Sequence, residues 1–116
     1  SLVRGTTSRS LVKFIRQAGA KEVHFRIASP PVRFPCFYGI DMPSHEELIG
    51  SRLTPEEIGQ ELGVDSLGYL SLEGMLSVVS DRSSFCDACF SGEYSAPLVD
   101  LDMGYLPGNH PIKVLS

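Results

Sequence analysis

The first part of the chain predicts an amphipathic helix over residues 6–18. Apolar side chains recur there at intervals of three and four positions, which places them on one face of a helix. The residues on this face are Leu11, Val12, Ile15 and Ala18, and Phe14 widens it. Gly19 follows directly, and a glycine in that place is typical of a helix end.

A strand is predicted over residues 22–27, because apolar and polar residues alternate there. One side of this strand holds Val23, Phe25 and Ile27, and the other holds His24 and Arg26. A loop, a helix, a glycine and a strand in this order make half of a βαβ unit. The pattern therefore predicts an α/β fold whose sheet is parallel at this point.

Two further helices are marked by capping residues. Ser44 with Glu47, and Thr54 with Glu57, form the S/T-x-x-E pattern in which side chains satisfy the free amides of a first helical turn. The second of these helices is expected to end at Gly63. A short strand over residues 64–69 and a helix capped by Ser71 follow, the latter with Leu72, Met75, Leu76 and Val79 on one face.

The segments between and after these elements are irregular. Prolines exclude a continuous helix or central strand over residues 29–43, yet the segment is rich in bulky apolar residues, so we expect a packed loop. After Ser80 the chain becomes polar and then carries a cysteine pair. From Gly92 onward, glycine and proline without periodicity predict an extended tail, of which residues 97–116 are the irregular end.

Length and charge limit the classes of function. The 116 residues suffice for one small domain with one core. The net charge is −4, and lysines and arginines are scattered singly, so no nucleic-acid partner is expected. No apolar run approaches the roughly 18–20 residues that span a bilayer, so no membrane association is expected. Three cysteines, an odd number, favour a reducing compartment, and we expect a cytoplasmic protein.

Candidate binding chemistry begins at Arg4-Gly5-Thr6-Thr7-Ser8, directly before the first predicted helix. Gly5 lets the backbone approach a ligand closely, and the following hydroxyl groups stand beside the free amides of the first helical turn. This arrangement suits a phosphate monoester. The same residues also fit an ordinary helix cap, and the glycine–lysine spacing of a Walker loop is absent.

Cys36, Cys86 and Cys89 are the candidate metal ligands. The spacing of Cys86 and Cys89 can bring two thiolates to one metal, and Cys36 lies in the proline-rich loop. A redox pair or two small buried side chains would fit the same spacing. Zinc held by three cysteines and one histidine is a further alternative, for which the available histidines are His24, His45 and His110.

A series of motifs in order resembles the glutamine phosphoribosylpyrophosphate (PRPP) amidotransferase family. Residues 2–8 resemble the second half of the PRPP signature of type I phosphoribosyltransferases. The other similar segments are residues 17–24, 29–31, 35–43, 46–49, 65–70 and 86–94. The similarity covers residues 1–96, whereas residues 97–116 match no segment of that family.

The resemblance implies part of a type I phosphoribosyltransferase-like parallel sheet with an irregular cysteine-containing C-terminal extension. Residues 1–80 would form a partial transferase domain, residues 81–96 a cluster-binding segment and residues 97–116 a tail. Arg4 to Ser8 would hold the 5′-phosphate of PRPP or of a purine nucleotide. The resemblance is to the iron–sulfur branch of the family, in which Cys36, Cys86 and Cys89 would bind a [4Fe–4S] cluster with a fourth cysteine upstream.

The family makes 5-phosphoribosylamine from PRPP and glutamine, the first step of de novo purine biosynthesis. Its ribose- and magnesium-binding aspartates and its glutaminase domain would precede Ser1, so the chain is expected to be a C-terminal fragment that is inactive alone. The full-length enzyme is expected to be a homo-oligomeric glycosyltransferase.

Other classes of function stay open from the residues. A non-enzymatic metal- or redox-binding module would use the three cysteines, with the Gly5 loop serving only as a helix cap. A salvage phosphoribosyltransferase that acts on a base would have no need of the three cysteines.

Overall fold

The computed structural model describes residues 1–40 and 44–95, so the predicted tail over residues 97–116 lies outside the described residues. The chain opens with a short loop and helix α1, Thr6–Gln17, as the hydrophobic spacing predicts. Strand β1, His24–Ile27, follows after a turn. A further strand, β2, spans Ser66–Tyr69.

The two strands form a parallel pair. His24 lies opposite Ser66, and Ile27 lies opposite Tyr69. The predicted α/β fold with a parallel sheet is therefore confirmed, although both strands begin two residues later than their patterns predict. Parallel pairing requires a crossover connection, and the helices between the strands supply it.

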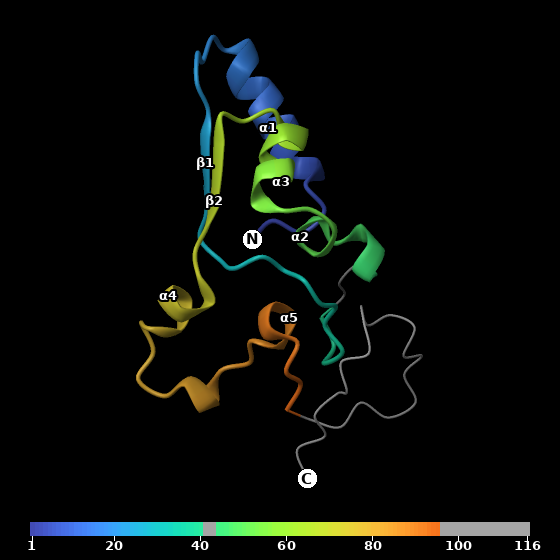
Figure 1. The fold of residues 1–116 in the computed structure, drawn as a ribbon, viewed down its shortest axis with the longest axis vertical. Coiled ribbons are helices and arrows are strands. Elements are labelled where there is room, and N and C mark those ends of the chain that lie inside the picture. Colours follow the sequence, from blue (N-terminus) through green and yellow to red (C-terminus); the bar gives the residue numbers. More distant parts are fainter. Residues whose placement is uncertain (41–43, 96–116) are drawn as a thin grey trace.

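This connection contains the 3-10 helix η1, His45–Glu47, and helices α2, Ile49–Arg52, and α3, Pro55–Leu62. Both predicted capping boxes are present, at the starts of η1 and α3. The sequence did not predict α2, because four residues are too few to show a helical period. In Figure 1, α1 and α3 lie on the same side of the sheet, and α2 lies below them.

A small hydrophobic core joins these elements. It consists of Leu2, Ile27, Ile49, Ile58 and Leu62, with Phe25, Leu53, Val64, Leu67 and Tyr69 packed against it. Both Leu48 and Ile49, at the start of α2, are completely buried. The unpredicted helix therefore supplies the deepest part of the core.

The apolar face of α1 is covered only in part, which corrects the sequence prediction. Val12 is 2% exposed, whereas Leu11 is 46% and Phe14 is 69% exposed. Ala18 is exposed as well. Within the described residues the sheet has two strands, and α1 packs beside α3 rather than across a wide sheet.

Below the sheet, the chain forms a second group of short helices: α4, Leu72–Leu76, η2, Arg82–Ser84, and α5, Ala88–Ser91 (Figure 1). The helix predicted after Ser71 is shorter than expected, and its face is wrong in part, because Val79 lies beyond its end and none of its residues is buried. Residues 92–95 form neither helix nor strand, as predicted for the tail, but this first part packs against the rest of the chain. Tyr94 is 4% exposed, and its hydroxyl donates to the Pro35 carbonyl over 2.6 Å.

Asp65 ties three segments together at the upper end of the sheet. Its Oδ2 accepts hydrogen bonds from the Val23 amide at 2.7 Å and from Arg16 Nη2 at 2.6 Å. Arg16 also donates to the carbonyls of Lys21 and Gly63. The Val23 hydrogen bond, and then that of Arg16, hold the pKa of Asp65 below its ordinary value.

The substitution Asp65→Asn should lower the stability of the folded chain in a pH-dependent way. The pKa of Asp65 is lower in the folded than in the unfolded chain, so its stabilisation is present above the ordinary pKa and is lost as pH falls through the folded-state value. Urea unfolding midpoints at pH 7 and pH 3 measure this effect. The difference between wild type and D65N should shrink at pH 3.

The control is E56Q, which removes a carboxylate that forms no ion pair with a described residue. Its midpoint should stay close to that of the wild type at both pH values. An equal midpoint for D65N and E56Q at pH 7 would contradict the role of Asp65.

Candidate functional site

The candidate phosphate loop has an open helix N-terminus. Gly5 is the residue before α1 and has a left-handed backbone, with φ 85°. No side chain caps the helix. The Arg9 amide is the first to bond back, to the Gly5 carbonyl over 2.8 Å, and the amides of Thr6, Thr7 and Ser8 donate to no acceptor among residues 1–40 and 44–95.

These free amides adjoin a hollow. Residues 1–8 line a cavity of about 590 Å³ that is open to solvent. The positive end of the α1 dipole lies at this hollow, and free amides at a helix N-terminus favour an anion there. The alternative of an ordinary Thr or Ser side-chain cap is not what the structure shows, because no hydroxyl occupies the amides.

The core holds the loop in place from below. Leu2 is 2% exposed and belongs to the core cluster. The Val3 carbonyl accepts a hydrogen bond from the Ile49 amide over 2.9 Å. A Cβ atom at Gly5 would lie 3.1 Å from Ile49 Cδ1, so glycine is required here both by the left-handed backbone and by the close approach of Ile49.

Two arginines beside the loop form ion pairs. Arg4 Nε lies 3.5 Å from Glu47 Oε1, and both side chains are about half exposed. Arg9, in the second turn of α1, pairs with Glu61 of α3. Of the five predicted phosphate-binding residues, Arg4 to Ser8, Arg4 thus contacts η1 and Gly5 packs against α2.

The three cysteines come from two segments that pack together. The Cys89 carbonyl accepts hydrogen bonds from the amides of Arg33 and Phe34, at 3.0 and 3.1 Å. Cys36 lies two residues farther along, and its sulfur accepts from the Tyr38 amide at 3.4 Å. These bonds bring α5, which carries Cys89, against the proline-rich loop.

An aromatic cluster adjoins the thiols. The Tyr94 ring lies 5.1 Å from that of Phe37 and 5.8 Å from that of Tyr38, measured between centroids. Burial is the largest cause of the raised pKa of Tyr94, and the Cys89 and Cys36 thiols contribute. The sequence placed Phe37 and Tyr38 in a packed loop but gave no sign that Tyr94 would complete it.

The thiols influence one another electrostatically. Burial raises the pKa of the Cys89 thiol, and the neighbouring Cys86 and Cys36 thiols raise it further. All three cysteines are free; Cys86 is exposed, and the other two are half-buried. The three predicted ligands are therefore gathered in one region of the molecule, at the surface of the lower group of helices.

Whether the three cysteines suit a metal centre depends on whether it is a single ion or an iron–sulfur cluster. In the described part of the chain, no three His, Cys, Asp or Glu side chains are arranged to hold one metal ion. The zinc alternative gains no support from this, and His110 lies outside the described residues. In a [4Fe–4S] cluster each cysteine thiolate binds a different iron atom. The cysteines therefore need not all reach a single point, and three cysteines in one region are compatible with such a cluster.

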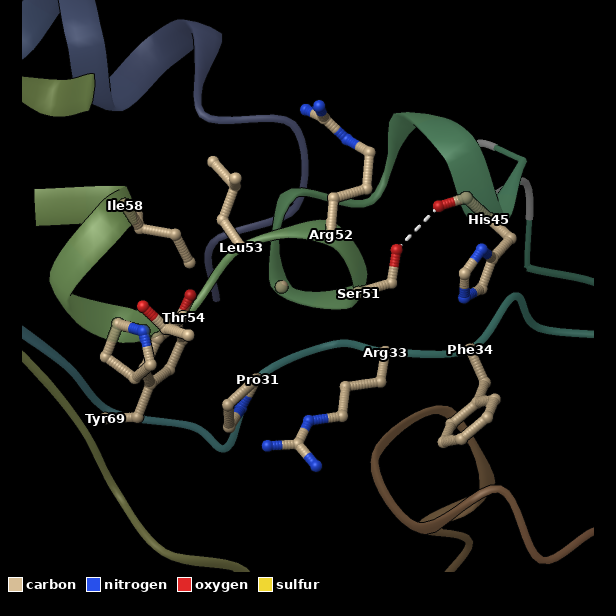
Figure 2. A pocket seen from close by; sticks show the side chains of 12 residues that line it. Pro31, Arg33, Phe34, His45, Ser51, Arg52, Leu53, Thr54, Ile58 and Tyr69 are labelled. Atoms are coloured by element: carbon tan, nitrogen blue, oxygen red, sulfur yellow. Dashed lines mark hydrogen bonds between the residues drawn. The ribbon is translucent and has the colours of Figure 1, made fainter. Parts of the chain in front are cut away.

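A further cavity, of about 370 Å³, lies between residues 31–34 and helices α2 and α3. No pattern in the sequence predicts this cavity. Figure 2 shows Arg33 and Arg52 on its lining, but the Arg52 side chain points away from Arg33. The Tyr69 hydroxyl at this cavity is buried without a hydrogen-bond partner among the described residues, and burial raises its pKa.

Comparison with known proteins identifies close relatives. No family model matches the chain. It is 57% identical over 101 residues to an amidophosphoribosyltransferase of Synechocystis sp., which covers 86% of this chain and 20% of the relative. It is 56% identical over 94 residues to that of Methanocaldococcus jannaschii, which covers 81% and 20% of the two chains. The chain thus spans about a fifth of the length of these relatives.

A solved structure is similar to this chain in both sequence and fold. The glutamine PRPP amidotransferase from B. subtilis complexed with ADP and GMP superposes with a TM-score of 0.72 at 54% identity. The match covers 81% of this chain and 22% of that one. The resemblance and the fold class predicted from the motifs are confirmed. No helix in residues 1–40 and 44–95 combines the length and apolar character needed to cross a bilayer.

The exposure of the thiols predicts an order of alkylation. Cys86 is exposed, whereas Cys89 is half-buried with a raised pKa, so less of its reactive thiolate is present at neutral pH. Iodoacetamide at pH 7.5 should modify Cys86 several times faster than Cys89, as followed by peptide mass spectrometry. In urea the two rates should converge, and equal rates in the folded chain would contradict the structure.

Proposed function

We propose that this chain is part of an amidophosphoribosyltransferase and holds the 5′-phosphate of PRPP in its first loop. The complete enzyme would make 5-phosphoribosylamine from PRPP and glutamine, the first step of de novo purine biosynthesis. The observation that carries the proposal is the set of free amides at Thr6, Thr7 and Ser8, in a chain 57% identical to such an enzyme. Free backbone amides at a helix N-terminus are a typical binding site for a phosphate group.

The loop would act by binding and orientation. The left-handed Gly5 turns the backbone so that the amides of the next three residues face one hollow. A phosphate there accepts charge-assisted hydrogen bonds, which are about twice as strong as neutral ones. The hydroxyl groups of Thr6, Thr7 and Ser8 and the Arg4 guanidinium are the further donors. Fixing the 5′ end of the sugar in this way would orient its C1 for displacement of pyrophosphate.

The remaining parts of the reaction would come from other segments. Glutaminase and further transferase segments would supply ammonia and the acidic ligands for Mg²⁺, which would offset the charge of pyrophosphate. The exposed Leu11 and Phe14 of α1 support such a partner, because they leave apolar surface uncovered within the described residues. A homo-oligomeric enzyme of the cytoplasm, where free cysteines persist, fits these features.

We further propose that Cys36, Cys86 and Cys89 bind a [4Fe–4S] cluster. Their gathering by the contacts of α5 with the proline-rich loop supports this assignment. When bound, the cluster would cross-link the two segments. The raised pKa of Cys89 means that binding must release its proton, so cluster assembly should be favoured by higher pH. The relatives favour this enzyme hypothesis over a free-standing redox module.

The substitution Gly5→Ala tests the phosphate site. A side chain on a left-handed residue costs about 1–2 kcal/mol, and here it also meets Ile49, so the loop amides should shift. Loss of one hydrogen bond to a charged group is worth about 1.5–3 kcal/mol. Ribose 5-phosphate should therefore bind G5A about ten-fold or more weakly than wild type in a calorimetric titration, and ribose should bind neither.

Gly19→Ala is the matched control. Gly19 is also left-handed, with φ 100°, but nothing lies within 4 Å of a Cβ there. G19A should lose stability through the left-handed backbone alone, so less than G5A, and should keep the affinity for ribose 5-phosphate. If wild-type chain does not distinguish ribose 5-phosphate from ribose, the proposed site is wrong.

Iron binding tests the second proposal. Anaerobic incubation of the chain with ferric iron, sulfide and excess thiol, which reduces part of the iron, should yield bound iron and sulfide in equal amounts. Ser substitution of Cys36, Cys86 or Cys89 should reduce this binding. Wild type that binds zinc in preference, or retains iron without sulfide, would contradict the cluster assignment.

A further inference from the structure

Two residues of the crossover connection, Glu47 and Ile49, contact three consecutive residues of the loop. Glu47 pairs with Arg4, the Ile49 amide donates to the Val3 carbonyl, and the Ile49 side chain packs on Gly5. Leu48, between them, is completely buried. The end of η1 and the start of α2, which are distant from the loop in sequence, thus hold the loop in place.

Glu47 has two tasks in this support. Its Oε2 accepts a hydrogen bond from the Ser44 amide over 3.2 Å, which completes the capping box of η1. Its Oε1 lies 3.5 Å from Arg4 Nε. The hydrogen bond from the Ser44 amide restrains the carboxylate at a place where it can also pair with Arg4.

The geometry of the pair leaves the outer end of Arg4 available. The contact is made at Nε, the nitrogen nearest the main chain, and the two terminal nitrogens of the guanidinium remain for another acceptor. Arg4 also lines the hollow next to the free amides of α1. An arginine paired with a carboxylate on its Nε side can present its terminal nitrogens to a phosphate in that hollow.

We propose that Glu47 is a positioning residue for the phosphate site, which holds Arg4 so that its guanidinium faces the bound 5′-phosphate. This inference rests on the proposed function of the loop. Glu47 itself does not touch the phosphate; a carboxylate there would repel it. Its contribution acts through Arg4, and it must outweigh the repulsion that its own charge exerts on the ligand.

The substitution Glu47→Gln separates these effects, with Glu46→Gln as its control. Glutamine still serves in a capping box, so η1 should persist in E47Q. E46Q removes the same charge one residue away, from a side chain that forms no ion pair with a described residue. Affinity for ribose 5-phosphate should fall about two- to five-fold in E47Q relative to E46Q, the range typical of exposed ion pairs.

A double-mutant cycle with Arg4→Gln completes the affinity test. In the R4Q background, Glu47 has no arginine to hold, so E47Q should no longer weaken binding and should strengthen it slightly through the loss of repulsion. Equal affinities of E47Q and E46Q, or the same effect of E47Q with and without Arg4, would overturn the positioning role.

Nuclear magnetic resonance of the Arg4 side chain provides a readout that does not need a ligand. Relaxation of the Arg4 Nε–H group should show a more restricted side chain in wild type and E46Q than in E47Q. Equal restriction in all three chains would overturn the inference, whatever the loop binds. A restricted Arg4 side chain in wild type without ribose 5-phosphate binding would instead overturn the proposed phosphate site on which the inference rests.

Discussion

Ile49 contacts the first loop at Val3 and at Gly5, and the site is built outward from these contacts. Ile49 is completely buried, and the Cβ position of Gly5 is only 3.1 Å from its Cδ1. The same residue donates its amide to the Val3 carbonyl. A core side chain that fixes a loop at two points also fixes the direction in which α1 leaves it. The free amides of Thr6 to Ser8 owe their placement to hydrophobic packing beneath them.

Much of this arrangement could be predicted from local patterns. The period of α1, the alternation around β1 and the capping boxes at Ser44 and Thr54 each depend on residues close together in sequence, and each appears in the structure. The loop at Gly5 was identifiable because glycine before a helix start has a specific conformational use. The motifs near Gly5 are also short runs of neighbouring residues, so the resemblance to the amidotransferases could be recognised from the sequence.

What the sequence could not predict depends on contacts between distant segments. Helix α2 is too short to show a period, although its first residue is the centre of the core. The exposure of Phe14 depends on how many strands stand opposite α1, which no helical pattern reveals. The burial of Tyr94 depends on a hydrogen bond to Pro35, across a separation of 59 residues. Such pairings carry no local signature.

The hydrogen bonds from the Arg33 and Phe34 amides to the Cys89 carbonyl have a consequence for the order in which parts of the chain fold. These residues are far apart in sequence, and the entropy cost of closing a loop grows with its length. The sheet pairs residues 42 positions apart, and most of the core lies in it and in its crossover helices. The Cys89 contacts span 55 and 56 positions, and Cys89 follows the sheet in the chain. A nascent chain can therefore seat its candidate phosphate loop before its cysteines become neighbours.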